Sequence, residues 1–134
     1  EVLSIKDEIF TKQKQDIAKM IRNFTKWVIL RELKDDGEYV ERLLEKLIVE
    51  IQTKSNLLIQ VNQEAFDKMP DILDHIQKKL GELKNVRVEV DHDINDQGIV
   101  LESDNGIING TLEEQFKSLD KLFESIGVRE DNDE

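Results

Sequence analysis

The spacing of the apolar residues changes along this chain, and the change limits the folds that the chain can adopt. An apolar stripe recurs every seven residues in the first part of the chain, at Leu3, Phe10, Ile17 and Phe24. That spacing is typical of a helix with one apolar side. Residues 86–90 instead alternate between valine and a charged residue, which indicates a half-buried strand. A chain with both spacings combines helices with a β-sheet.

Residues 1–34 are predicted to form one long helix. The positions half a heptad after the stripe are polar early and apolar late: Lys6, Gln13, Met20 and Trp27. Residues 11–16 contain no apolar side chain, so this segment has little to bury. We expect the early half to be a solvated stalk and the late half to lie against protein. Its stripe could be core, a dimer seam or a groove for a partner helix.

Two further helices and a strand are predicted between the stalk and residue 81. Asp35 and Glu38 have the spacing of a capping box ahead of the second helix. Residues 57–61 are a short apolar run bounded by asparagine, which indicates a buried strand, and Asn62 can cap a third helix. Pro70 predicts either a kink in that helix or the start of its longer second segment. The apolar face of the second helix is Val40, Leu43, Leu44, Leu47, Ile48 and Ile51, and that of the third is Phe66, Met69, Leu73, Ile76 and Leu80.

The C-terminal part is predicted to form a hairpin and a last helix. Asn105 and Gly106 are a strong hairpin signal between apolar runs at 99–101 and 107–108. Thr111 to Glu114 have the pattern of a capping box. The face of the last helix is Leu112, Phe116, Leu119, Phe123 and Ile126, followed by Gly127 and a charged tail at residues 129–134.

The predicted order is therefore α-α-β-α-β-β-β-α, an α+β fold. We divide the chain into a helical extension at residues 1–34 and an α+β domain at residues 35–134. A chain of 134 residues can bury one sizeable core, and two independent cores are not expected.

The charge of the chain narrows the classes of partner. The formal net charge is −11, and 37% of the residues are charged. This field repels nucleic-acid phosphates and anionic lipid headgroups, so a partner with a basic surface is favoured. The chain has no cysteine, which fits the cytoplasm, and no apolar run approaches the roughly 18 residues of a membrane span. We expect a cytoplasmic protein without nucleic-acid binding or membrane insertion.

One acidic segment resembles a calcium loop. Asp91, Asp93, Asn95 and Glu102 have the spacing of its ligand positions, but Asp96 stands where the loop requires glycine. We interpret the segment as a solvated acidic loop between strands. Neither histidine has a second histidine or a cysteine spaced to join it at a metal, and His75 is expected at the surface.

The sequence lacks the usual catalytic motifs. It contains no nucleotide-binding glycine motif and no G-x-S-x-G context. We therefore expect no catalytic, cofactor-binding or metal-binding residues, and we interpret the chain as a protein-binding module.

The second half resembles the FliH family of flagellar export ATPase regulators and their type III secretion stator relatives. The similarity covers about residues 17–127, and residues 97–119 are its specific part. It rests on the strand Leu57 to Val61 with Asn62-Gln63-Glu64, on Val86 to Val90, and on the runs Gln97-Gly98-Ile99-Val100-Leu101-Glu102-Ser103-Asp104, Asn105-Gly106-Ile107-Ile108 and Thr111-Leu112-Glu113-Glu114-Gln115. The peripheral-stalk E subunit of vacuolar and archaeal ATPases is a more distant likeness. E subunits tend to carry an arginine near this position, and this chain has Gln115 there. The difference favours the flagellar family.

The resemblance implies a homodimer whose C-terminal domains grip the N-terminal region of the export ATPase. It also implies that the protein restrains hydrolysis, delivers the ATPase to the export gate and the C-ring, and has no catalytic residues. The predicted dimer interface is Ile17, Met20, Ile21, Phe24, Trp27 and Val28. The predicted partner-binding surface is the last helix together with the hairpin. Its nominated residues are Phe116, Leu119 and Phe123, with Glu113 and Asp120 on the exposed flank. The alternatives are an injectisome stator, a peripheral-stalk E-type subunit, or a small enzyme or calcium module.

Overall fold

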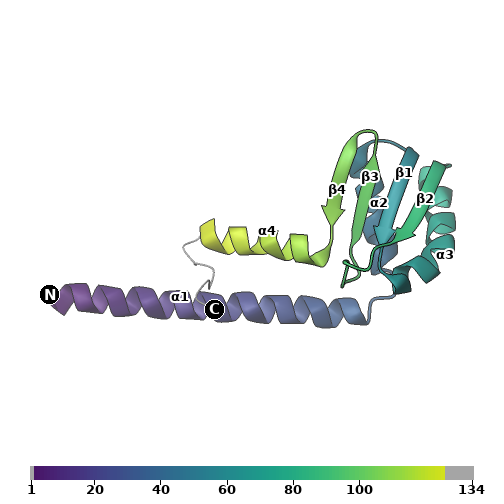
Figure 1. The fold of residues 1–134 in the computed structure, drawn as a ribbon. Helices are drawn as coiled ribbons and strands as arrows, with labels where there is room; N and C mark the ends of the chain where they lie inside the picture. The colour runs from purple at the N-terminus through teal and green to yellow at the C-terminus, as the bar shows by residue number, and fades with distance from the viewer. Residues whose placement is uncertain (1, 126–134) are drawn as a thin grey trace. The chain divides into compact units, whose positions relative to one another are not determined.

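The computed structural model describes residues 2–125, with side chains from Ser4 onward. Its eight elements follow the predicted order, which confirms the α+β class (Figure 1). The helices are α1 (Val2–Lys34), α2 (Tyr39–Ile51), α3 (Gln63–Leu80) and α4 (Leu112–Ser125). The strands are β1 (Ser55–Val61), β2 (Lys84–Val90), β3 (Ile99–Ser103) and β4 (Gly106–Gly110). Ile126, Gly127 and the predicted tail lie outside the described residues.

The chain forms two compact units. The α/β unit is Asp36–Gln115, and the helical unit joins α1 to the part of α4 that starts at Phe116. α4 therefore contributes its first residues to one unit and the remainder to the other. The predicted roles of residues 1–34 as a stalk and of residues 35–134 as an ATPase-binding domain stay predictions.

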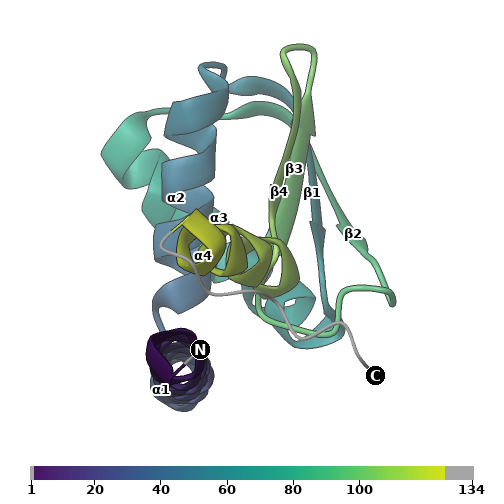
Figure 2. The ribbon, with the colours of Figure 1, turned by 90° about the vertical axis from the view of Figure 1, so that its left-hand side faces the viewer.

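The α/β unit is built on a four-stranded sheet in the order β2-β1-β3-β4. β1 and β2 are parallel and are joined through α3, whereas β3 runs antiparallel to both β1 and β4. α2 and α3 lie on the same side of the sheet (Figure 2). Along β1, Leu57, Ile59 and Val61 are buried, while the residues between them are partly exposed. Within this unit the other face of the sheet is therefore open.

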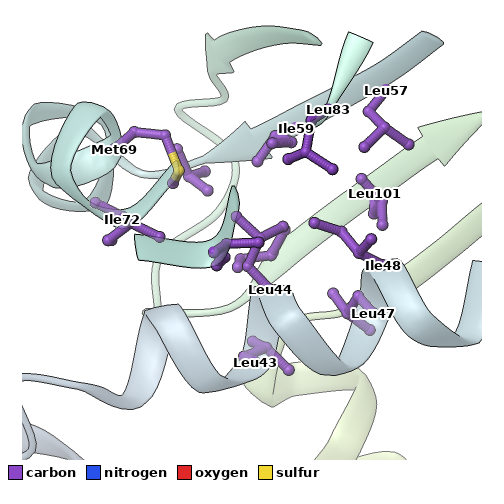
Figure 3. Close-up of a cluster of buried hydrophobic side chains, with 14 of the residues drawn as sticks. Leu43, Leu44, Leu47, Ile48, Leu57, Ile59, Met69, Ile72, Leu83 and Leu101 are labelled. Atoms are coloured by element: carbon purple, nitrogen blue, oxygen red, sulfur yellow. The ribbon is translucent and has the colours of Figure 1, made fainter. Parts of the chain in front are cut away.

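The core lies between the sheet and these two helices. Leu44 and Ile48 of α2 point toward Ile59 and Leu101 of the sheet (Figure 3). Met69 of α3 belongs to the same buried cluster. All five side chains are nearly inaccessible to water. Each contributes on the order of 1.5–3 kcal/mol through burial. The predicted assignment of the second helix to the core is confirmed.

The start of α2 differs from the prediction. The N-cap residue is Glu38, and no side chain forms a cap hydrogen bond there. Asp36 instead accepts the Glu38 N–H through Oδ1 at 3.0 Å and pairs with Arg42. The predicted Asp35–Glu38 capping box is therefore wrong. The physical reason is that Asp36, two residues before Glu38, forms a local turn with the same amide group.

α3 begins as predicted and packs differently. Asn62 Oδ1 accepts the Ala65 N–H at 2.9 Å, which confirms the cap. The helix runs continuously through Pro70, so the proline does not divide it. The predicted face is partly wrong, because Phe66 is exposed. The helix is rotated so that its buried residues are Ala65, Met69, Ile72 and Ile76.

The hairpin between β3 and β4 is confirmed, with a different turn. Asp104 and Asn105 form the turn, and Gly106, with φ of 129°, is the first residue of β4. Asn105 donates its Nδ2 hydrogen to the Ile51 carbonyl at 2.8 Å, which ties the turn to the end of α2.

Thr111 caps α4 as predicted. Its Oγ1 accepts the Glu114 N–H at 3.2 Å. Its own N–H donates to Asn109 Oδ1 at 3.0 Å, so Asn109 supports the cap from the end of β4.

Candidate protein-binding surfaces

The acidic loop uses its carboxylates to hold its own backbone. Asp96 accepts the Gly98 N–H at 2.6 Å and the Glu113 N–H at 3.2 Å. Asp91 accepts the Asp93 N–H at 2.9 Å. Among the residues that the structure describes, no group of three or more His, Cys, Asp and Glu side chains is placed to hold a metal ion. The arrangement is that of a structural loop.

His75 lies on the surface, as predicted. Its Nδ1 is 2.8 Å from Glu41 Oε1, so it links α3 to α2. Lys79, one turn later on α3, approaches the same glutamate at 3.9 Å. The histidine belongs to a surface charge cluster.

The predicted dimer interface forms a continuous exposed stripe on α1. Ile17, Met20, Ile21, Phe24 and Trp27 all expose more than half of their surface, and Val28 is partly buried. The rings of Phe24 and Trp27 are 5.9 Å apart, and the Arg31 guanidinium lies 5.2 Å from the Trp27 ring. Phe10 extends the stripe toward the N-terminus and is also exposed. We call these seven apolar side chains, from Phe10 to Val28 and without Arg31, the α1 stripe.

The opposite face of α1 contacts α4 within the helical unit (Figure 1). Lys26 Nζ is 2.8 Å from Asp120 Oδ1 and 5.6 Å from the centre of the Phe116 ring. Arg22 Nε is 3.8 Å from the same carboxylate, too far for a hydrogen bond, and Arg22 is nearly buried. The side chain of Asp120 is only 13% exposed. Its predicted place on an exposed flank is therefore wrong, because α1 covers it.

The predicted partner-binding residues lie on α4 and are partly covered. Phe116, Leu119 and Phe123 are all half-buried, on the side of the helix that carries Asp120. Leu122 is 60% exposed on the neighbouring side. Sequence reasoning missed Leu122, although a leucine one position away from the predicted face was the available signal.

Ile107 in β4 is 65% exposed and belongs to the hairpin predicted as part of the partner surface, but the residue itself was not named. The hairpin was predicted, but the position of β4 at the edge of the sheet was not. The signal in the sequence was the run from Gly106 to Gly110, which contains no charged residue.

No helix among the described residues is both long enough and apolar enough to cross a membrane.

An α+β fold with a long helix that exposes an apolar stripe places the chain among proteins with candidate surfaces for protein binding. The family model of the flagellar assembly protein FliH matches residues 3–119. The chain belongs to this family. No curated protein matches the chain. The match contains residues 97–119, the specific part of the resemblance seen in the sequence, and it also includes nearly all of α1.

Membership of this family places the chain in flagellar assembly and type III export. The family consists of regulatory, non-catalytic subunits of the flagellar export apparatus. The more distant likeness to the peripheral-stalk E subunit stays a prediction.

Proposed function

We propose that this chain is a non-catalytic regulator, or stator, that binds the N-terminal region of the flagellar type III export ATPase. In this role it restrains ATP hydrolysis and helps to deliver the ATPase to the export gate and the C-ring, in the cytoplasm at the flagellar base. The observation that carries the proposal is the family match over residues 3–119.

Two apolar surfaces support a role in assembly. The α1 stripe is proposed to be the homodimer interface, because it is a helical seam of large side chains that face solvent in the single chain. Phe116, Leu119 and Phe123 of α4 are proposed to contact the ATPase. The charge of −11 suits a partner with a basic surface.

The first test is co-purification of the chain with a candidate flagellar export ATPase, with hydrolysis measured in the presence and the absence of the chain. We expect a stable complex and slower hydrolysis. An injectisome ATPase and a rotary ATPase head, offered in parallel, should bind more weakly. Preferential capture of either one would contradict the flagellar assignment.

A matched pair of variants tests the α4 surface. Phe123→Asp should weaken capture of the ATPase by about tenfold or more, because a charge would replace a partly buried aromatic side chain in the interface. Val49→Asp is the control, since Val49 is 60% exposed on α2, outside this surface. Equal affinity of the two variants for the ATPase would move the partner surface elsewhere.

A further inference from the structure

The two edges of the sheet are protected differently. The edge strand β2 carries Lys84, Arg87 and Glu89, all exposed. Such charges are the usual means by which proteins prevent an edge strand from pairing with another chain. The other edge strand, β4, has the sequence GIING, with no charge and no proline, and its Ile107 is 65% exposed. β4 therefore lacks the protection that β2 has.

The backbone of β4 can accept another strand. Pairs in an antiparallel ladder alternate between hydrogen-bonded and non-hydrogen-bonded types. The pair Ser103–Gly106 closes the turn and is of the hydrogen-bonded type, so Leu101–Ile108 is of the same type. Ile107 and Asn109 consequently direct their N–H and C=O groups away from β3. No strand of the described chain pairs with that edge.

A hollow of about 400 Å³ accompanies this edge. It lies where the end of α2 meets the start of β4, and its lining is Glu50, Ile51, Gln52, Asn105, Gly106, Ile107 and Ile108. A strand added beside β4 would place alternate side chains on its two faces. One set would reach the hollow, and the other would lie beside Ile107 on the open face of the sheet.

The charges around the edge indicate the chemistry of the added strand. Glu50 lines the hollow, Glu102 is the cross-strand neighbour of Ile107, and Asp104 lies in the turn. Lys46 pairs with Glu50 at 3.8 Å and offsets one of these three acidic charges. The other two leave the edge acidic. A second copy of this chain would bring the same acidic side chains to the contact, whereas a basic segment would be attracted to them.

We propose that β4 binds an extended segment of a partner protein as a fifth strand of the sheet. The segment has apolar side chains at alternate positions and Lys or Arg at its flanks. Main-chain hydrogen bonds to Ile107 and Asn109 provide affinity, and the hollow selects the side chain that enters it. This surface uses neither the α1 stripe nor Phe116, Leu119 and Phe123 of α4, so it can fail while the proposed function holds.

The test is a selection of short random peptides from a displayed library on the full chain. Selected peptides should alternate apolar residues and carry Lys or Arg. Ile107→Lys places on β4 the kind of charge that protects β2, and Ile107→Pro removes the outward N–H. Both should weaken binding by about tenfold or more, through charge repulsion or a lost hydrogen bond next to a disturbed edge. Leu122→Lys is the matched control, because it places the same charge at an equally exposed apolar residue of α4.

A synthetic copy of a selected peptide should also slow amide hydrogen exchange at Ile107 and Asn109. Peptides that bind wild type and Ile107→Lys equally, acidic peptides, or no enriched peptide at all would overturn the proposal. A lower molecular mass of Ile107→Lys than of wild type in solution would assign the edge to a second copy and would equally overturn it. If Ile107→Pro does not fold, Ile107→Lys decides, because its side chain is already exposed.

Discussion

At the scale of single residues, Gly98 leaves the least room for a Cβ atom of the glycines described in the α/β unit. A Cβ atom at this position would lie 2.2 Å from Thr111 Cα and 2.8 Å from the Gly110 carbonyl oxygen. Both neighbours are backbone atoms, which cannot move aside as a flexible side chain can. The start of β3 and the start of α4 can therefore meet only because residue 98 has no side chain.

Gly98→Ala should destabilise the protein by about 2–3 kcal/mol, because the new methyl group overpacks a backbone contact. The measurement is urea unfolding, with a lower midpoint at an unchanged slope. Gly37→Ala is the control, since nothing lies within 4 Å of its added Cβ. It should change the stability by less than about 0.5 kcal/mol. Equal midpoints for the two variants would show that the contact at residue 98 is relaxed in solution.

The pKa of Asp36 leads to a prediction about how the stability of the turn before α2 depends on pH. Its pKa lies below the ordinary value of 3.8, first because Arg42 donates a side-chain hydrogen bond to the carboxylate, and second because the Glu38 N–H does so. Because the pKa is lower in the folded state than in the unfolded state, the ionised carboxylate stabilises the turn before α2 above pH 3.8. This stabilisation is lost as the pH falls through the folded-state pKa. We expect a carboxyl titration by NMR to have its midpoint below 3.8.

Arg42→Gln should raise the pKa of Asp36 toward 3.8, because it removes the largest cause of the shift. Lys46→Gln is the control, since Lys46 pairs with Glu50 and not with Asp36. A titration midpoint that does not respond to Arg42→Gln would mean that this pair is open in solution.

At the scale of elements, α4 is the unusual helix, because its two parts belong to different units. Thr111 and Asn109 fix its start in the α/β unit. Beyond Gln115 it is held to α1 by Phe116 and by the charges of Asp120, Lys26 and Arg22. An element of this kind depends on a few contacts for the position of its second half.

Asp120→Asn should loosen the second half of α4, because it leaves Lys26 and the nearly buried Arg22 without their counter-charge. We expect a cost of about 1–3 kcal/mol for that contact, seen as faster amide hydrogen exchange at residues 116–125. Exchange within α2 should stay unchanged. The control is Glu124→Gln, an exposed acid on the same helix. Equal exchange rates in residues 116–125 of the two variants would rule out the charge contact as the restraint.

At the scale of the whole molecule, α1 carries most of the large apolar side chains that are exposed among the described residues, and the α1 stripe, apart from Val28, is part of that set. Phe24→Asp combined with Val28→Asp should convert the proposed homodimer into a monomer, because two charges would be buried in a helical seam. Light scattering measures the mass. Val49→Asp is the control, since Val49 is an exposed apolar residue on α2 and should not change the mass. A clean dimer of the double variant would show that the seam lies elsewhere.

Local patterns by themselves determined the element order, the α2 core face and the Asn62 and Thr111 caps, and they placed an apolar stripe on α1. Each depends on residues within one or two turns of a helix or along one strand, so its cause is visible in a short stretch of sequence. The tertiary structure alone decided that Ile72 rather than Phe66 is buried, that α1 covers Asp120, and that β4 is an unprotected edge. Those outcomes depend on which distant segments become neighbours. The strand order β2-β1-β3-β4 and the docking of α4 on α1 are set by packing across the whole chain, and no spacing within one element encodes them.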